Sequence, residues 1–209
     1  MSASTINGSD RGAALRRGRA LEYLTVGWNL IEGLIAIGSG WLAGSTALVG
    51  FGVDSFIESS SGLTLLWRLH GDDANERREQ IALRLVGASL LLLAAYVAWE
   101  AAGALWRREV PDASYIGIGL AIVSLIVMPL LARAKRRVAV QLGSRALTAD
   151  SKQTDICAYL SAILLGGLVL NALFGWWWAD PLAALVMVPI IAREGVHALR
   201  GEACDDGCS

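Results

Sequence analysis

The sequence predicts an all-α membrane protein with six transmembrane helices and both termini in the cytoplasm. Of its 209 residues, 55% are hydrophobic and only 18% are charged, whereas about a quarter of the residues in soluble domains are charged. The mean hydropathy is +0.50. The charged residues gather in short clusters, and long uncharged stretches separate these clusters. A soluble fold would spread polar faces along every element, so this pattern excludes a soluble protein.

Six stretches are long and apolar enough to cross a membrane, since about 20 residues span roughly 30 Å of hydrocarbon. Each must be a helix, because a helix satisfies its backbone polar groups within the segment. Tryptophans fall at several of the expected span ends, as is typical of residues at the membrane interface. The expected spans are residues 21–42, 45–67, 81–106, 114–132, 147–174 and 176–194.

The rest of the chain is short. Residues 1–20 are small, polar and basic, and they are expected to form a cytoplasmic tail rather than a cleaved signal peptide. Residues 21–199 would form one transmembrane domain, followed by a short cytoplasmic tail of Cys and Asp residues at 200–209. Glycines of the first two spans indicate close helix–helix contact: Gly27, Gly33, Gly38, Gly40, Gly50 and Gly52.

The distribution of Lys and Arg predicts the orientation. If the N-terminus is inside, the cytoplasmic segments hold fifteen of these residues, Lys135 included, and the outer loops hold only Arg107 and Arg108. Cytoplasmic loops of membrane proteins are enriched in positive charge. Both termini are therefore expected inside, with the chain in the cell (inner) membrane. The basic clusters flank apolar runs, so they indicate topology rather than nucleic-acid binding.

Two carboxylates lie inside the second expected span. Asp54 and Glu58 are four residues apart, so they share one face of a helix. A charged residue at the centre of a span costs about 2.5–3.5 kcal/mol, and two carboxylates repel unless a cation or a proton lies between them. Oxygen donors of this kind suit a divalent cation. The alternatives are protonation, or neutralisation by an Arg from another helix, although the sequence has no Arg in mid-span.

The fifth expected helix places Asp150, Gln153 and Cys157 on one face, at positions i, i+3 and i+7. At about 1.5 Å per residue, Asp54 lies about 13 Å and Glu58 about 20 Å below the outer boundary. By the same rise, Gln153 lies about 12 Å and Cys157 about 18 Å above the inner boundary. Asp54 is then at the same depth as Cys157, and Glu58 is at the same depth as Gln153. Four donors would meet near the midplane, as zinc commonly requires. Taken alone, the cysteine is more typical of a small core residue.

At these residues the sequence resembles the transmembrane part of the cation diffusion facilitator family, which exports zinc and other divalent metals. In that family, Asp-x-x-x-Asp on span two and His-x-x-x-Asp on span five hold the transported metal. The resemblance therefore implies a metal site at Asp54, Glu58, Gln153 and Cys157. The first position is identical, the second is conservative, and the last two are departures that soften the site. The matching stretches are GSTALVGFGVDSFIE (44–58), ALTADSKQTDIC (146–157) and WADPLAALVMVPIIAREGVHAL (178–199).

The resemblance also implies a function. It indicates a homodimeric secondary transporter that exports a divalent metal cation, zinc or another transition metal, from the cytoplasm by proton antiport. Proton and metal would compete for the same carboxylates. The chain carries no nucleotide-binding motif, no prosthetic group is expected, and we do not expect an enzyme. The family usually carries a cytosolic metal-binding domain after span six, and this sequence resembles the short branch that lacks it.

A second function remains open. The scaffold could serve a non-transporting membrane metal sensor or partner subunit, and the departures at Gln153 and Cys157 favour this alternative.

Further residues are secondary candidates for metal or proton binding. Asp150 shares the face of the fifth helix described above. Glu32 reaches similar depth on the first span, where it would be a proton carrier, a third carboxylate or a helix-packing partner. Cys204 and Cys208 would collect soft metal on the cytoplasmic side or belong to a disordered end. The loop at residues 70–73 would be solvated or bind a second metal.

Overall fold

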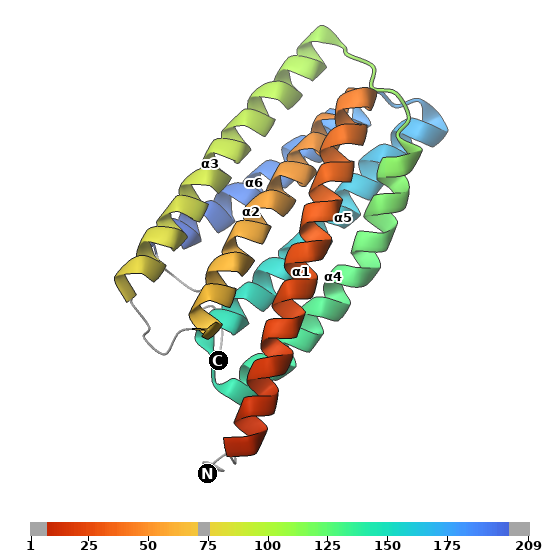
Figure 1. The fold of residues 1–209 in the computed structure, drawn as a ribbon. Helices are drawn as coiled ribbons and strands as arrows, with labels where there is room; N and C mark the ends of the chain where they lie inside the picture. The colour runs from red at the N-terminus through yellow and green to blue at the C-terminus, as the bar shows by residue number, and fades with distance from the viewer. Residues whose placement is uncertain (1–7, 71–75, 201–209) are drawn as a thin grey trace, which may run out of the picture.

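The computed structural model describes residues 8–70 and 76–200, which form six α-helices and no strand. The helices form one bundle in which successive helices run in opposite directions (Figure 1). We call the end at which α1 begins the terminal end. The six-helix, all-α prediction is confirmed. The helices are α1 (Gly8–Ala43), α2 (Thr46–His70), α3 (Glu76–Arg107), α4 (Tyr115–Leu142), α5 (Arg145–Phe174) and α6 (Ala179–Arg200).

Five of the described helices, all except α2, are long and apolar enough to cross a membrane. The hydropathy of α2 is lowered by Asp54, Glu58 and the serines at 59–61. This helix packs against α1, α3, α5 and α6, and both of its acids are buried. The polar middle of α2 therefore faces other helices rather than lipid, as charged groups within a membrane normally do.

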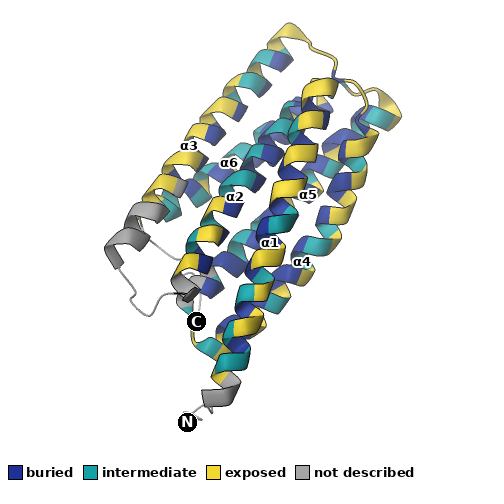
Figure 2. Cartoon of the chain, viewed as in Figure 1, coloured by how far each residue is buried: buried dark blue, intermediate teal, exposed yellow. Residues whose placement is uncertain are grey.

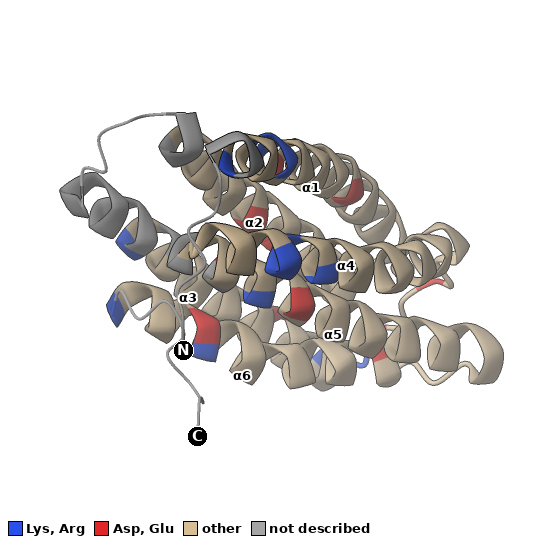
Figure 3. Ribbon diagram, turned by 90° about the horizontal axis from the view of Figure 1, so that it is seen from below, with Lys and Arg blue, Asp and Glu red and all other residues tan. Residues whose placement is uncertain are grey.

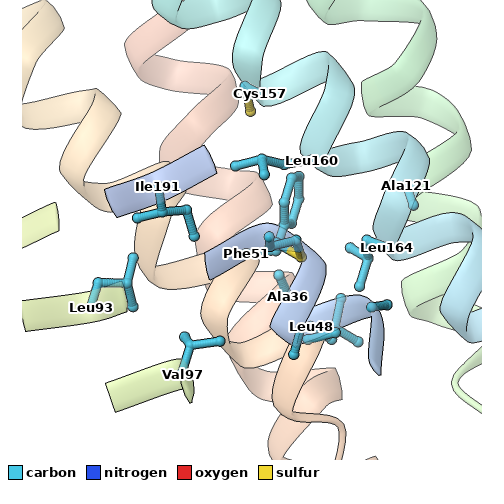
Figure 4. Packing of buried hydrophobic residues seen from close by; sticks show 14 of the residues in the cluster. Ala36, Leu48, Phe51, Leu93, Val97, Ala121, Cys157, Leu160, Leu164 and Ile191 are labelled. Atoms are coloured by element: carbon cyan, nitrogen blue, oxygen red, sulfur yellow. The ribbon is translucent and has the colours of Figure 1, made fainter. Parts of the chain in front are cut away.

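The outer surface of the bundle is apolar. Buried residues follow the inner faces of the helices and exposed residues follow the outer faces (Figure 2). Large apolar side chains such as Leu34, Leu92 and Trp106 are among the exposed ones. The interior apolar cluster is built around Phe51 and Leu164, and Cys157 belongs to it (Figure 4). An apolar exterior around a core with polar groups fits a bundle that is surrounded by lipid.

The fourth helix is longer than its predicted span. The sequence indicated an end near residue 132, with a basic loop from 133 onward, whereas α4 continues to Leu142. It ends at Gly143, whose φ of 62° is left-handed and suits a glycine that caps a helix. The expectation that Lys135 lies in a loop is wrong, because its side chain is fully buried inside the bundle. Clustered charge ended the predicted span, but it did not end the helix.

Glycines set the distance between α1 and α2. A Cβ added to Gly33 would lie 3.0 Å from the carbonyl oxygen of Gly52. A Cβ added to Gly52 would lie 2.9 Å from the backbone nitrogen of Ile37. Close contact is therefore confirmed at these two glycines, where the helices meet backbone to backbone. The prediction is wrong at Gly27 and Gly38, where an added Cβ would meet no heavy atom within 4 Å.

A buried acid ties the start of α6 to the start of α2. Ser45 Oγ donates a hydrogen bond to Asp180 Oδ1 over 2.5 Å and accepts one from the Leu48 amide over 3.1 Å. The Ala47 amide donates to Asp180 Oδ2 over 3.4 Å. Ser45 acts as the N-cap of α2, and Asp180 holds that cap in place. The depth of the acids farther along α2 is thereby fixed relative to α6.

Candidate functional site

Buried charged side chains line the inner faces of α1, α2, α4 and α5. Seen along the bundle, the acidic and basic positions interrupt ribbons that are otherwise uncharged (Figure 3). Each of these side chains is at most 9% exposed, in a region where a charge is costly unless it is paired. The buried charged residues of these four helices are Glu22, Glu32, Asp54, Glu58, Lys135 and Asp150.

Three of them form a carboxylate cluster, which we define as Glu32, Asp54 and Glu58. The two acids of α2 share its inner face, and the charges of Glu58 and Glu32 both act on Asp54. Ser55 Oγ donates a hydrogen bond to Glu32 Oε2 over 3.1 Å. Two helices thus bring three carboxyl groups into one buried region. Of the roles considered for Glu32, this position favours the third carboxylate.

The two predicted residues of α5 differ in their positions. Cys157 is 2% exposed and interacts with Glu58. Gln153 is only partly buried, and its neighbour Thr154 is the residue that reaches the cluster. Thr154 Oγ1 donates a hydrogen bond to Glu58 Oε1 over 3.1 Å. Sequence reasoning missed this threonine.

A signal for the threonine was present in the sequence. Asp150, Thr154, Cys157 and Ser161 follow the spacing i, i+4, i+7 and i+11, which describes one helix face. All four side chains are buried. Ser161 Oγ continues this polar face by donating a hydrogen bond to Ser124 Oγ of α4 over 3.1 Å. The sequence prediction selected Gln153 because it is a potential ligand. Thr154 fits the helical period of this buried face better than Gln153 does.

Lys135 lies between the carboxylate cluster and the terminal end of the bundle. Its Nζ is 2.5 Å from Asp150 Oδ2 and 3.2 Å from Glu22 Oε2, and it donates to Thr154 Oγ1 over 3.4 Å. This ion triad of Glu22, Lys135 and Asp150 joins α1, α4 and α5. The sequence offered no Arg in mid-span as a partner for buried acids, and a lysine fills that role for Asp150. This secondary metal candidate is therefore already paired with a cation.

A further acid comes from α6. The charge of Glu194 acts on Asp54, and the charges of His197, Arg193 and Lys152 act on Glu194. Sequence reasoning gave Glu194 no role in the site. The available signal was its position near the end of the last span, because an acid within a span is costly and therefore indicates a functional or structural role.

The candidate ligands do not enclose an ion in this conformation. Among the described residues, no three or more His, Cys, Asp and Glu side chains form a group that could hold a metal ion. Cys204 and Cys208 lie outside the described residues, as do the side chains of residues 70–73. The structure thus brings Asp54, Glu58 and Cys157 into one region without closing a coordination sphere around them.

The family comparison decides what this bundle is. The Cation efflux transmembrane domain matches residues 23–202. The chain belongs to the cation efflux family. The match extends from α1 through α6 and includes the three stretches in which the sequence showed its resemblance, so that prediction is confirmed. This cation efflux protein is accordingly a multi-pass membrane protein.

Three curated relatives are similar over most of the chain. An uncharacterized transporter of Synechocystis sp. is 26% identical over 194 residues, which cover 88% of this chain and 63% of the relative. An uncharacterized transporter of Methanocaldococcus jannaschii is 27% identical over 182 residues, with 81% and 63% covered. Transmembrane protein 163 of Xenopus laevis is 25% identical over 182 residues, with 86% and 65% covered. The matched region thus spans less than two thirds of each relative.

Proposed function

We propose that this chain is a secondary transporter that exports a divalent, zinc-like metal cation from the cytoplasm in exchange for protons. The observation that carries the proposal is the buried carboxylate cluster of Glu32, Asp54 and Glu58. Among the described residues of α1, α2, α4 and α5, the buried basic side chain is Lys135, which hydrogen-bonds to Glu22 and Asp150 and whose charge also acts on Glu58. One lysine does not balance all of these buried carboxylates, and unbalanced buried charge is costly, so the cluster favours binding of positive charge.

The ligands would come from both central helices. Asp54 and Glu58 supply oxygen donors from α2, and Cys157 supplies sulfur from α5. Zinc accepts carboxylate and thiolate ligands in a tetrahedral array, and the thiolate favours zinc over metals that prefer oxygen alone. Gln153 stays the predicted fourth ligand, in the position that the family pattern implies. Because the coordination sphere is open in this conformation, these side chains must converge when the ion binds.

Protons would be exchanged at the same oxygens. Metal binds the deprotonated carboxylates, so entry of the metal releases protons and protonation releases the metal. The proposal places both termini in the cytoplasm and the chain in the inner membrane, as the distribution of Lys and Arg predicts. It also places two copies in a homodimer, as the family resemblance implies. It includes no prosthetic group, no nucleic-acid partner and no enzymatic reaction.

The second candidate is a membrane metal sensor or a partner subunit that does not transport. Two observations favour it. Gln153 and Cys157 replace the family's His and Asp, and the described side chains form no closed metal group. A sensor would bind metal without moving it, so binding and flux measured on the same protein separate the two functions.

The deciding experiment uses the full chain in liposomes that contain a zinc-sensitive dye. Zinc is supplied on the side of the termini, and a pH gradient that is acid on the opposite side drives exchange. We expect zinc flux with the natural protein and a loss of about 100-fold or more with Asp54→Asn, since one charged ligand is removed at nearly constant volume. Asp112→Asn makes the same change at an exposed position and should leave the flux unchanged.

Two results would contradict the proposal. Zinc binding without flux would support the sensor or partner subunit, and unchanged flux in Asp54→Asn would remove the carboxylate site.

A further inference from the structure

One oxygen of Glu58 is engaged and the other is not. Oε1 accepts a hydrogen bond from Thr154 over 3.1 Å. Oε2 is buried and has no hydrogen-bond partner among the described residues. Glu58 is 3% exposed, so bulk water does not replace the missing partner. A buried, unpartnered carboxylate oxygen is costly, which makes Oε2 the atom that is available to a cation.

The threonine is itself held in place. A hydroxyl has one proton to donate and two lone pairs with which to accept. Lys135 can only donate, and its Nζ approaches Thr154 Oγ1 at 3.4 Å. The hydroxyl proton is then shared between Glu58 Oε1 and the backbone oxygen of Asp150, each 3.1 Å away. A threonine inside a helix otherwise tends to bond only to the carbonyl four residues earlier.

Lys135 is fixed by its own partners. It bridges Asp150 of α5 and Glu22 of α1 at 2.5 and 3.2 Å, and its side chain is fully buried. A chain of contacts therefore runs from the ion triad through Thr154 to Glu58. The charge of Lys135 acts on Glu58, and the hydrogen-bonded connection between them runs through the Thr154 hydroxyl.

We propose that Thr154, oriented by Lys135, is a specificity-determining residue that limits Glu58 to one-oxygen coordination through Oε2. The inference rests on the proposed function and deepens it, because it assigns the preference for a zinc-like ion to a residue that is not itself a ligand. Four-coordinate zinc is satisfied by one oxygen from each carboxylate. Cations that prefer six or more oxygens gain from a second one. Occupying Oε1 therefore disfavours ions such as Mn²⁺.

The test compares two substitutions at one position. Thr154→Val removes the hydroxyl, and Thr154→Ser keeps it. Zn²⁺ and Mn²⁺ binding is measured by titration of the full-length protein in detergent, and competitive flux is measured in liposomes. We expect Thr154→Val to lower the preference for Zn²⁺ over Mn²⁺ by about three- to tenfold, the range that one hydrogen bond supplies. Thr154→Ser should keep the natural preference.

Controls separate selectivity from stability. Thr148→Val removes a hydroxyl from the same helix, where Oγ1 bonds only to the Ser144 carbonyl among the described contacts, and should leave the preference unchanged. If Lys135 acts through the threonine, Lys135→Met should shift the preference in the same direction as Thr154→Val. The variant that carries both substitutions should then shift the preference little further than either single variant, since the effects of coupled residues are non-additive. Lys135→Arg should retain more of the natural preference than Lys135→Met does.

The inference would be overturned if Thr154→Val and the natural protein showed the same preference for Zn²⁺ over Mn²⁺. It would also be overturned if Thr154→Ser shifted this preference as much as Thr154→Val does. Failure of the proposed function is visible separately. If zinc binds but no flux occurs, the transport proposal fails while the binding titrations still decide the role of Thr154. If the natural protein binds neither metal, both proposals fail.

Discussion

At the scale of single residues, Cys157 distinguishes this site from one built of oxygen alone. Its thiol is buried and interacts with Glu58. Sulfur ligands favour thiophilic metals, whereas oxygen ligands suit manganese. If Cys157 is a ligand, as proposed, its removal should change the metal preference through the loss of a direct bond.

We expect Cys157→Ser to reduce transport of zinc and cadmium by about tenfold or more, and that of manganese by much less. Competitive flux of the three metals in liposomes measures the effect. The substitution exchanges sulfur for oxygen with little change in shape, so packing stays nearly constant. An equal loss for all three metals would show that the cysteine acts through packing instead.

Residue spacing predicted part of the site and missed the rest for a physical reason. Asp54 and Glu58 share a helix face because they are four residues apart, and spacing within one helix suffices to show it. The helical period of α5 places Thr154 on its buried face, but the contacts of Thr154 with Lys135 and Glu58 join three different helices. Contacts between helices depend on how the helices are rotated and tilted, and a periodicity within one helix carries no such information.

At the scale of helices, the contact between α1 and α2 positions the cluster. Glu32 lies one residue from Gly33, and Asp54 lies two residues from Gly52, so the same backbone contact brings the acids together. Any residue that separates the helices should therefore weaken both folding and metal binding.

Gly52→Ala tests this contact. The added Cβ would lie 2.9 Å from the Ile37 backbone nitrogen, which cannot move aside as a side chain can. We expect a loss of about 1–3 kcal/mol in stability, as for other overpacked positions, and weaker zinc binding. Gly38→Ala on α1 is the matched control, because its Cβ meets open space. Thermal unfolding in detergent measures both variants, and equal unfolding temperatures would contradict the role assigned to the contact.

The cap between α2 and α6 makes a second prediction for helices. Asp180→Asn keeps the size of the side chain but removes the charge that accepts hydrogen bonds from Ser45 and the Ala47 amide. Loss of a helix cap costs about 0.5–2 kcal/mol, so we expect a comparable fall in stability. Zinc selectivity should stay natural, since this acid contacts the start of α2, whereas Glu58 lies near the middle of that helix. A change in selectivity without a change in stability would contradict a purely structural role.

Helix existence was easier to predict than helix length. Long, largely apolar stretches indicated all six helices, because the surface of a helix that faces lipid is mostly apolar, although the polar middle of α2 lowers its hydropathy. It failed at the end of α4, where Lys135 and Leu142 continue a helix whose inner face is buried against protein. A buried lysine with two acidic partners has the same sequence signature as a loop lysine, so only tertiary structure distinguishes them.

At the scale of the whole molecule, the charges of the bundle determine what can drive transport. The described parts of α1, α2 and α5 bury several carboxylates, and Lys135 balances only part of that charge. His70 lies at the end of α2, and His197 lies in the last turn of α6. The charge of His197 acts on Glu194. If the protein exchanges protons for metal, as proposed, the carboxylates are the groups expected to carry the protons.

Proton coupling should consequently survive the loss of both histidines. Metal and protons compete for the same carboxylate oxygens, so apparent zinc affinity should fall as the medium is acidified. In liposomes, a gradient that is acid on the destination side should draw zinc from the side of the termini. We expect the variant with His70→Gln and His197→Gln to keep this gradient dependence, with a flux within about twofold of the natural protein, as for changes outside a site. If the double variant still binds zinc but no longer responds to the gradient, histidines carry the protons and the carboxylate mechanism is wrong.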